Sequence, residues 1–343
     1  MARRPTLKDV AREADVSIAT VNRAIKGTPN VREETVRKVS DAAHRIGYHG
    51  VGLLSQRLRT DLPEVRLGFV LHKQKQAFYQ EFAEEITRQA AAYGAARCKV
   101  RIVFLSSQSP GDVAAALREI SGQVDAVAAT SVNHQSVTDA VAELHNGGTP
   151  CFALLSDFGQ GVRTTYIGLN NLKIGRGAAR MLSVASRNKG KLALFVGGYR
   201  WHGHELRETG FRSFFREHPD DLHVLDTLVN LETRQLTYEA TLALLARHGD
   251  LAGLYVAGGG MEGAIAALRE ERAPGQVALV VNELTPESRR AIIDGYVTMI
   301  IRTPLATLCH TLVGQMAAVV ANPDHALPGQ TFLDPVITLP EFL

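Results

Sequence analysis

Residues 6–25 read Thr6-Leu-Lys-Asp-Val-Ala-Arg-Glu-Ala-Asp-Val-Ser-Ile-Ala-Thr-Val-Asn-Arg-Ala-Ile25. This stretch predicts two short helices with a turn between them. Thr6 and Asp9 have the spacing of a capping box at the start of the first helix, and apolar residues then recur at helical spacing. After a short break, Ser17 can cap the second helix. Two helices joined by a turn of about four residues form a helix-turn-helix, whose second helix can enter the major groove of DNA.

The outward face of the second helix carries side chains that can recognise bases. Arg23 can bind guanine through two hydrogen bonds, Asn22 can bind adenine, and Ile18 can contact a thymine methyl group, with Ala19 beside it. Hydroxyl side chains are suited to phosphate contacts that set the register on the duplex. The residues expected to make those contacts are Thr6, Ser17 and Thr20.

A third helix is predicted after Asn30, where Asn30 and Glu33 again have the spacing of a helix start. Its apolar face consists of Val36, Val39, Ala43 and Ile46, and it ends near Gly47. We therefore predict an all-α helix-turn-helix domain over residues 1–49.

The charge of the chain is unevenly distributed. The formal net charge is only +3, but residues 1–60 contain 12 Lys and Arg against 6 Asp and Glu. The remaining residues contain 26 basic and 29 acidic side chains. A basic head on a mildly acidic body indicates a polyanionic partner for the head alone. An ordinary solvated helical surface is the alternative explanation of the charge.

The ordered motif of residues 6–25, followed by Val31, Thr35, Val39, Gly47 and Tyr48, resembles the head of lactose-repressor (LacI/GalR) type transcription regulators. The resemblance places Ile18 and Ala19 at the two specificity positions and Arg23 at the base-reading arginine. Three residues depart from the family pattern. Asp15 stands where the family has a turn glycine, and Asp tolerates the left-handed conformation such a turn needs. Asn22 and Arg32 each replace a serine.

Residues 50–63 are expected to form a linker. In the family that it resembles, this segment is a hinge helix that folds on DNA and inserts a leucine into the minor groove. Leu58 best matches that wedge, and Arg57 and Arg59 would hold the adjacent phosphates. Gly50 and Gly52 destabilise an isolated helix by about 1 kcal/mol each, which is consistent with a hinge helix that folds only on DNA. A plain flexible linker is the alternative.

From Val65 onward, short apolar runs alternate with amphipathic helical patterns, which predicts an α/β core of parallel sheets. The expected strands are Val65–Leu71, Val100–Leu105, Asp125–Thr130, Cys151–Leu155, Lys191–Val196, Leu251–Val256, Val277–Val281 and Thr298–Ile301. The resemblance implies the periplasmic binding protein type I fold, in which two Rossmann-like lobes flank a cleft. It places chain crossings near residues 160–166, 293–297 and 322–330. The predicted core of 64–343 then has an N-lobe (about 64–162 and 296–322) and a C-lobe (about 163–295 and 323–343).

Ligands of such sheets bind beyond the carboxyl ends of the strands, so the residues after each strand are the candidate ligand site. The candidates are Phe78, Asn133, His134, Asp157, Trp201, Arg207, Asn282, Glu283 and Arg302. Carboxylates, amides, arginine and aromatic faces together suit a sugar or polyol. By family position, Phe78, Asp157, Arg207 and Glu283 match ligand contacts. Arg302 stands where many members have Gln, which favours an anionic or larger ligand.

Three of these candidates also have a purely structural interpretation. Phe78 can be a core aromatic, His134 a loop histidine, and Arg207 a partner in a surface ion pair. Three patterns suggest other chemistry but lack support. Residues 258–263 fit G-x-G-x-x-G, yet they lie deep in the second lobe, so we expect no dinucleotide cofactor. Asp157 and Glu283 lack a nucleophile, so we expect no enzyme, and His202 with His204 lacks further zinc ligands.

The sequence favours a DNA-binding regulator, most simply a repressor of carbohydrate-utilisation genes controlled by a small sugar. A homodimer is expected, because one helix-turn-helix reads only half of a pseudo-palindromic operator. No apolar run reaches the roughly 18 residues of a membrane span, no secretory signal is evident, and three cysteines form no disulfide framework. We therefore expect a soluble cytoplasmic protein without a membrane partner. A transport-type solute-binding protein and a corepressor-dependent regulator are the alternatives.

Overall fold

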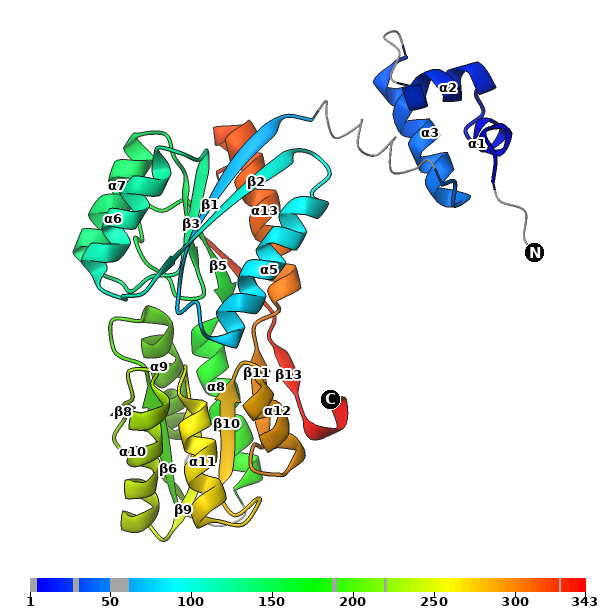
Figure 1. Cartoon of the computed structure of the whole chain (residues 1–343). Coiled ribbons are helices and arrows are strands. Elements are labelled where there is room, and N and C mark those ends of the chain that lie inside the picture. The colour runs from blue at the N-terminus through cyan, green and yellow to red at the C-terminus, as the bar shows by residue number, and fades with distance from the viewer. Residues whose placement is uncertain (1–4, 27–30, 50–61, 187–189, 219–220, 327) are drawn as a thin grey trace. The chain divides into compact units, whose positions relative to one another are not determined.

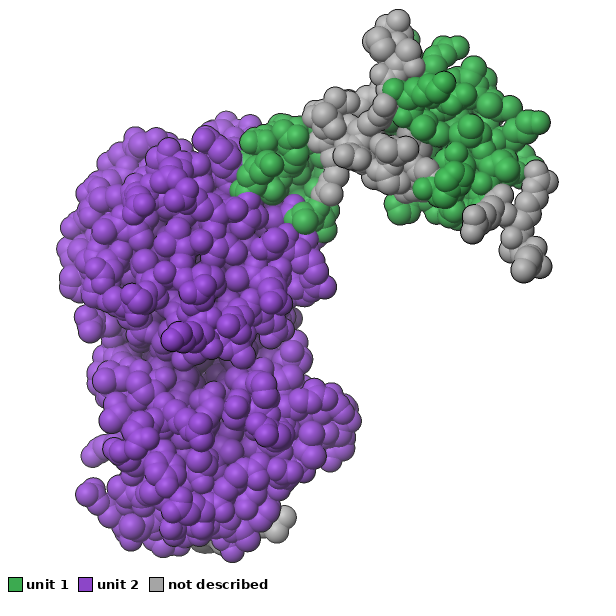
Figure 2. All heavy atoms as spheres, in the orientation of Figure 1, with its two compact units in different colours: residues 1–65, 91–99 green, residues 66–90, 100–343 purple. Residues whose placement is uncertain are grey.

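The computed structural model describes residues 5–26, 31–49, 62–186, 190–218, 221–326 and 328–343 (Figure 1). These residues fall into two compact units (Figure 2). The first comprises residues 1–65 with 91–99, and the second comprises residues 66–90 with 100–343. The helical head belongs to the first unit, and nearly all of the α/β core belongs to the second.

The head contains three helices, α1 (Leu7–Glu13), α2 (Ile18–Lys26) and α3 (Glu33–Arg45). The predicted caps of α1 and α2 are confirmed, whereas Asn30, expected at the start of the third helix, lies outside the described residues and Arg32 directly precedes α3. The backbone N–H and the hydroxyl of Thr6 donate to Asp9 Oδ2 at 2.9 and 2.7 Å, and Thr20 N donates to Ser17 Oγ at 3.1 Å. These contacts satisfy donors that a helix start leaves without intrahelical partners. The two caps therefore fix where α1 and α2 begin.

The turn between α1 and α2 contains Asp15 in the left-handed conformation, with φ of 52°. Asp is one of the few non-glycine residues that adopts this conformation readily. The prediction that Asp15 takes the role of a turn glycine is confirmed. Around this turn the three helices bury a small common core, which consists of Val10, Ala11, Ala14, Val21, Ala24, Val39, Ala42, Ala43 and Tyr48.

The N-lobe is built on a six-stranded sheet with the order β12-β5-β4-β3-β1-β2. Its strands are β1 (Glu64–His72), β2 (Arg97–Leu105), β3 (Ala126–Ala129), β4 (Cys151–Leu154), β5 (Thr165–Leu169) and β12 (Gln330–Leu333). Its helices are α5 (Ala77–Ala92), α6 (Pro110–Ser121), α7 (Gln135–Asn146) and α13 (Leu305–Ala321). Figure 1 shows α6 and α7 on one face of the sheet and α13 on the other.

The C-lobe is built on a seven-stranded sheet with the order β13-β11-β10-β9-β6-β7, and β8 also pairs with β6. The strands are β6 (Gly190–Val196), β7 (Leu222–Val224), β8 (Leu228–Val229), β9 (Leu251–Val256), β10 (Ala278–Asn282), β11 (Met299–Arg302) and β13 (Val336–Thr338). The helices are α8 (Asn171–Ala185), α9 (His202–Glu217), α10 (Arg234–Arg247), α11 (Met261–Glu271) and α12 (Pro286–Ile293). In the described part of this lobe, only β13 runs antiparallel to the strand with which it pairs.

Alternate residues of the C-lobe strands enter two different cores. Along β6, Leu192 and Leu194 pack with α8 and α9, whereas Ala193 and Phe195 pack with α10 and α11. Successive side chains of a strand point to opposite faces, and helices cover both faces of a parallel sheet. This arrangement explains why the strands are continuous apolar runs rather than alternating ones.

The chain crosses between the lobes later than predicted at each crossing. Residues 165–169 form β5 and pair with β4, so the first crossing follows Leu169 rather than 160–166. Residues 299–302 form β11 in the C-lobe, so the second lies near 303–304. The last lies between β12 and β13, because β12 pairs with β5. Gly159 and Gly161, which have positive φ, lie in the connection from β4 to β5 within the N-lobe, close to where the first crossing was expected.

No helix in the described part of the chain is both long enough and apolar enough to cross a membrane.

Candidate functional site

A cavity of about 490 Å³ lies at the carboxyl ends of strands from both lobes. Its N-lobe wall comes from the segment after β1 and from the ends of β3 and β4, and its C-lobe wall follows β6, β9, β10 and β11. The lining residues are Lys75, Gln76, Ala77, Phe78, Tyr79, Thr130, Leu155, Ser156, Leu169, Trp201, Gly203, His204, Arg207, Glu232, Arg234, Gly258, Gly259, Gly260, Met261, Glu262, Asn282, Glu283, Thr285, Pro286, Glu287 and Thr303. The prediction from the strand ends therefore located the cavity, since ligands of such sheets bind there.

Arg207 enters the cavity from α9 and is held by two hydrogen bonds. Its Nε donates to Asn171 Oδ1 at 2.7 Å, and its Nη1 donates to the carbonyl oxygen of Ala257 at 2.5 Å. Both acceptors are uncharged, and within the described residues Arg207 forms no ion pair. A positioned guanidinium whose charge is not neutralised by a carboxylate retains donors for a ligand.

Asn282 ends β10 beside Arg207 and contributes a second unused donor. Its side chain is 3% exposed, and its Oδ1 accepts a hydrogen bond from the hydroxyl of Tyr255 at 3.0 Å. Its Nδ2 has no hydrogen-bond partner in the described structure. A buried amide group without a partner costs free energy, so this nitrogen is suited to an acceptor on a ligand.

Glu283 follows directly, with its backbone in the left-handed region at φ of 70°. Thr303 donates to the carboxylate twice, from its backbone N at 3.0 Å and from its hydroxyl at 2.6 Å. Burial raises the pKa of Glu283 above its ordinary value, although the hydrogen bonds from Thr303 and the nearby Arg207 and Arg302 act in the opposite direction. The group is a fixed hydrogen-bonding side chain at the cavity wall.

Two aromatic side chains that were predicted as ligand contacts also line the cavity. Trp201 precedes α9 and is 9% exposed, and Phe78 lies in the first turn of α5. Their rings provide apolar faces on which the C–H groups of a sugar can stack. Five of the nine predicted ligand residues therefore line one cavity, namely Phe78, Trp201, Arg207, Asn282 and Glu283.

The other four predicted ligand residues lie elsewhere, which corrects the expected position of each. Asp157 is 3% exposed and is neutralised by Arg163, whose Nε and Nη2 donate to it at 2.5 and 2.8 Å. His134 caps α7, where its Nδ1 accepts from Ser136 N at 3.2 Å. Asn133 donates its backbone N–H to Arg200 O at 2.8 Å.

Arg302 lies in a second cavity of about 300 Å³. Phe78, Glu283 and Thr303 line both cavities, so the second lies behind part of the first. Arg302 is the last residue of β11 and does not line the first cavity.

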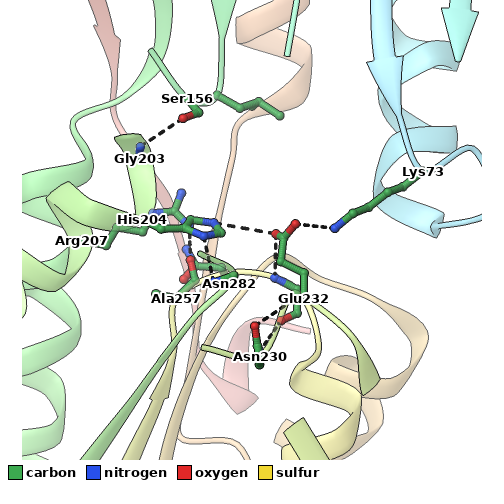
Figure 3. A network of polar contacts seen from close by, with 12 residues as sticks. Lys73, Ser156, Gly203, His204, Arg207, Asn230, Glu232, Ala257 and Asn282 are labelled. Atoms are coloured by element: carbon green, nitrogen blue, oxygen red, sulfur yellow. Dashed lines mark hydrogen bonds and ion pairs between the residues drawn. The ribbon is translucent and has the colours of Figure 1, made fainter. Parts of the chain in front are cut away.

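An ion pair beside the cavity, between Lys73 and Glu232, was not predicted from the sequence: Glu232 lines the cavity and Lys73 pairs with it. Figure 3 shows them pointing toward each other, with His204 on the other side of the carboxylate. Burial would raise the pKa of Glu232, but the adjacent ammonium group of Lys73 and the hydrogen bonds from Lys73 and the Gly259 backbone N–H hold it well below its ordinary value. Lys73 directly follows β1 and could have been found by the strand-end argument. Glu232 lies in a loop after a two-residue strand, for which the sequence carries no periodic signal.

The glycine motif at residues 258–263 has an explanation within the C-lobe. Gly260 has φ of 93°, and a Cβ there would lie 2.9 Å from Asn230 Nδ2. A Cβ on Gly258 would lie 2.5 Å from Cε1 of His204. These glycines make room for neighbouring protein groups, so the motif does not require a bound pyrophosphate.

In the head, the predicted base-reading face of α2 is accessible. Ile18 is 43% exposed, Ala19 and Arg23 are exposed, and Asn22 is half-buried. Among the expected phosphate contacts, Ser17 is exposed and Thr6 and Thr20 are half-buried, with their hydroxyls used in the caps. Arg57 and Leu58, expected in the hinge, lie outside the described residues.

Residues 6–50 match the bacterial regulatory proteins of the lacI family, and residues 67–321 match the periplasmic binding protein domain. The chain belongs to the LacI family of bacterial regulatory proteins. This LacI-family chain is 35% identical to catabolite control protein A of Priestia megaterium over 111 residues, 31% of this chain and 30% of that protein. It is 53% identical to the transcriptional regulator GntR of Pseudomonas aeruginosa over 45 residues, 13% of each chain. The matches thus span less than a third of these relatives.

Solved structures confirm the two-lobe fold of the LacI-family core. A solute-binding protein of Burkholderia graminis in complex with D-arabinose superimposes with a TM-score of 0.75 at 18% identity, covering 82% of this chain and 97% of that one. A solute-binding protein of Agrobacterium vitis bound with alpha-D-tagatopyranose has a TM-score of 0.73 at 20% identity, covering 81% and 95%. The predicted fold class, a helix-turn-helix head with a two-lobe α/β core, is therefore confirmed.

Proposed function

We propose that this protein is a sequence-specific DNA-binding regulator whose operator affinity is controlled by a small carbohydrate in the cavity of its core. One observation carries the proposal. A LacI-family head with an accessible recognition helix shares a chain with a two-lobe core that contains a polar cavity. The regulators and sugar-binding proteins that it resembles support this combination. We assign no catalytic role to the cavity.

The chemistry of the cavity supports a sugar or polyol. A volume of about 490 Å³ is within the roughly 300–1,000 Å³ of small-molecule sites. Arg207 and Asn282 provide unused donors, and Glu283 provides a hydrogen-bonding carboxyl group. Trp201 and Phe78 provide apolar faces. Vicinal hydroxyls donate and accept at once, and the sugar ring stacks on aromatic side chains, so a monosaccharide uses every one of these groups.

On DNA, α2 would enter the major groove with Arg23, Asn22, Ile18 and Ala19 at base edges. Residues 1–49 form the reading domain in this proposal and residues 50–63 form the hinge, with Leu58 as the minor-groove wedge and Arg57 on a phosphate. Two copies of the chain would bind the two halves of a pseudo-palindromic operator, because each head reads one half-site.

The protein would act in the cytoplasm, where operator DNA lies, as a repressor of carbohydrate-utilisation genes that the sugar releases. Release requires that the ligand bind one arrangement of the lobes more tightly than the other. If the sugar instead strengthens operator binding and so acts as a corepressor, it would bind at the same site.

Selection of binding sites from genomic DNA fragments tests the proposal. We expect recovery of a common pseudo-palindromic sequence, with binding that weakens steeply as salt increases, because phosphate contacts release counterions. A parallel thermal-shift screen of sugars, sugar phosphates and polyols should identify the effector. A ligand at 100 times its Kd stabilises the core by about 2.7 kcal/mol. A ligand-binding protein that retains no DNA at any salt concentration would instead be a solute-binding protein.

A further inference from the structure

Lys73 and Glu232 form an ion pair between the two lobes, at the edge of the cavity (Figure 3). Lys73 follows β1 of the N-lobe, and Glu232 lies between β8 and α10 of the C-lobe. The two side chains are 18% and 14% exposed. An ion pair this far removed from solvent is weakly screened by salt, so it differs from the many exposed pairs within each lobe.

The carboxylate of Glu232 is fixed from its own lobe before it meets the lysine. Gly259 N donates to Glu232 Oε1 at 3.2 Å, and the backbone N of Glu232 donates to Asn230 Oδ1 at 2.8 Å. His204 Nε2 lies 3.8 Å from the same carboxylate oxygen. Because Nδ1 of His204 accepts from Gly197 N at 3.0 Å, the proton of the neutral ring lies on Nε2, which faces Glu232.

Glycines and strained backbone make room for this cluster. A Cβ on Gly197 would overlap the side chain of Glu232, and a Cβ on Gly258 would lie 2.5 Å from His204 Cε1. Lys73 and Glu232 have φ of 52° and 55°, in the left-handed region that few non-glycine residues adopt. Left-handed residues of this kind persist where the surrounding structure holds them, and they concentrate at sites that bind or switch.

We propose that the Lys73–Glu232 pair, backed by His204, is a latch that holds the two lobes closed when no ligand is bound. Two hydrogen bonds between described residues also cross this edge, and neither involves a charged group. Asn133 N donates to Arg200 O at 2.8 Å, and Gly203 N donates to Ser156 Oγ at 3.1 Å. Removal of one partner leaves an unpaired charge that closure would have to bury, which strongly disfavours the closed arrangement. The latch therefore sets the resting equilibrium between closed and open lobes, whether or not the head binds DNA.

Hydrogen exchange of the ligand-free full-length protein tests the latch. The backbone amides of Asn133 and Gly203 each donate a hydrogen bond to the other lobe, so their exchange rates report how often the lobes separate. We expect Lys73→Met and Glu232→Gln each to accelerate exchange at both amides by about tenfold or more, as one charge is left unpaired. The double variant Lys73→Met with Glu232→Gln leaves no unpaired charge, so exchange should return toward the wild-type rate. The control is Glu143→Gln, which breaks an exposed pair with Arg118 inside the N-lobe.

The proposal is overturned if both single variants exchange at the wild-type rate at these two amides. It is also overturned if the double variant exchanges as fast as the faster single variant, because the two charges would then act independently. Protection of the β9 amides reports whether the C-lobe remains folded. If Glu232→Gln loses protection at the β9 amides, its C-lobe has unfolded and its result is set aside. The exchange rates of Lys73→Met then test the proposal alone, since Lys73 lies in the N-lobe.

Discussion

Arg207 Nε donates a hydrogen bond to Asn171 Oδ1 over 2.7 Å, which joins the cavity arginine on α9 to the first residue of α8. The backbones of the two helices also approach closely, because a Cβ on Gly175 of α8 would collide with the carbonyl oxygen of Arg207. The position of the guanidinium therefore depends on helix packing as well as on the cavity itself.

Replacement of Arg207 should separate ligand binding from DNA binding. We expect Arg207→Ala to weaken ligand binding by at least about tenfold, since hydrogen bonds from charged groups contribute roughly 1.5–3 kcal/mol. DNA binding without ligand should stay at the wild-type level. Calorimetric titration with the screened ligand and DNA titration measure the two effects. Arg216→Ala, on the exposed end of the same helix, is the control, and normal ligand affinity in Arg207→Ala would refute the cavity assignment.

Two glycines of α8 should respond in opposite directions to alanine. Gly175→Ala should destabilise the protein by about 3 kcal/mol, as overpacking forces α9 away. Gly177→Ala should stabilise it by about 0.5–1 kcal/mol, because a Cβ there meets nothing within 4 Å and alanine favours helix. Urea denaturation of both variants measures the difference. Equal effects of the two substitutions would show that α8 and α9 do not pack as described.

Arg23 should determine sequence selectivity rather than general DNA affinity. We expect Arg23→Ala to reduce discrimination between the operator and a single-base variant by about 1–3 kcal/mol, the contribution of a bidentate arginine–guanine contact. Ligand-induced thermal stabilisation of the core should be unchanged, which shows that the variant is folded. Competition titrations with the two duplexes give the discrimination. Unchanged discrimination would place Arg23 on a phosphate.

Stability should fall with acidity because of His204. Burial lowers the pKa of His204 to about 4, against 6.5 for the unfolded residue. Between these values the unfolded state binds the extra proton, so the folded state loses about 2–3 kcal/mol as the pH falls from 6.5 toward 4. His204→Asn should flatten this dependence between pH 7.5 and 4.5 in urea titrations. Burial also lowers the pKa of His72, but His72 is present in both proteins and cancels in the comparison. Parallel curves for the two proteins would contradict the buried neutral state of His204.

Local sequence patterns predicted the elements, and their boundaries were close to those observed. The expected strand at Leu251–Val256 is β9 without change, and the Thr6–Asp9 cap is where it was expected. β5 was missed, because the chain was expected to cross to the other lobe near residues 160–166, directly before this strand. The pattern also missed the two-residue strand β8 and the short strands β7, β12 and β13 at the sheet edges. Short edge strands bury too little apolar surface to carry a clear period.

Site residues were predicted where a strand end alone decides the position. Asn282 is the last residue of β10 and Glu283 follows it directly, so their place at the cavity could be inferred. Asp157 follows β4 in the same way, but Arg163, six residues later, pairs with it. Glu232 is at the cavity because its loop folds over Gly197 and Gly259. Such tertiary pairings leave no spacing in the sequence from which they could be inferred.

The most direct test of the account is the operator Kd of the full-length protein with and without the ligand identified by thermal shift. Fluorescence anisotropy with the selected duplex at one fixed salt concentration provides it. We predict that saturating ligand changes the operator Kd by about 5- to 150-fold, the range of a coupling free energy of 1–3 kcal/mol, and that Arg207→Ala removes this change. An operator Kd that is the same with and without a ligand known to bind the core would contradict it.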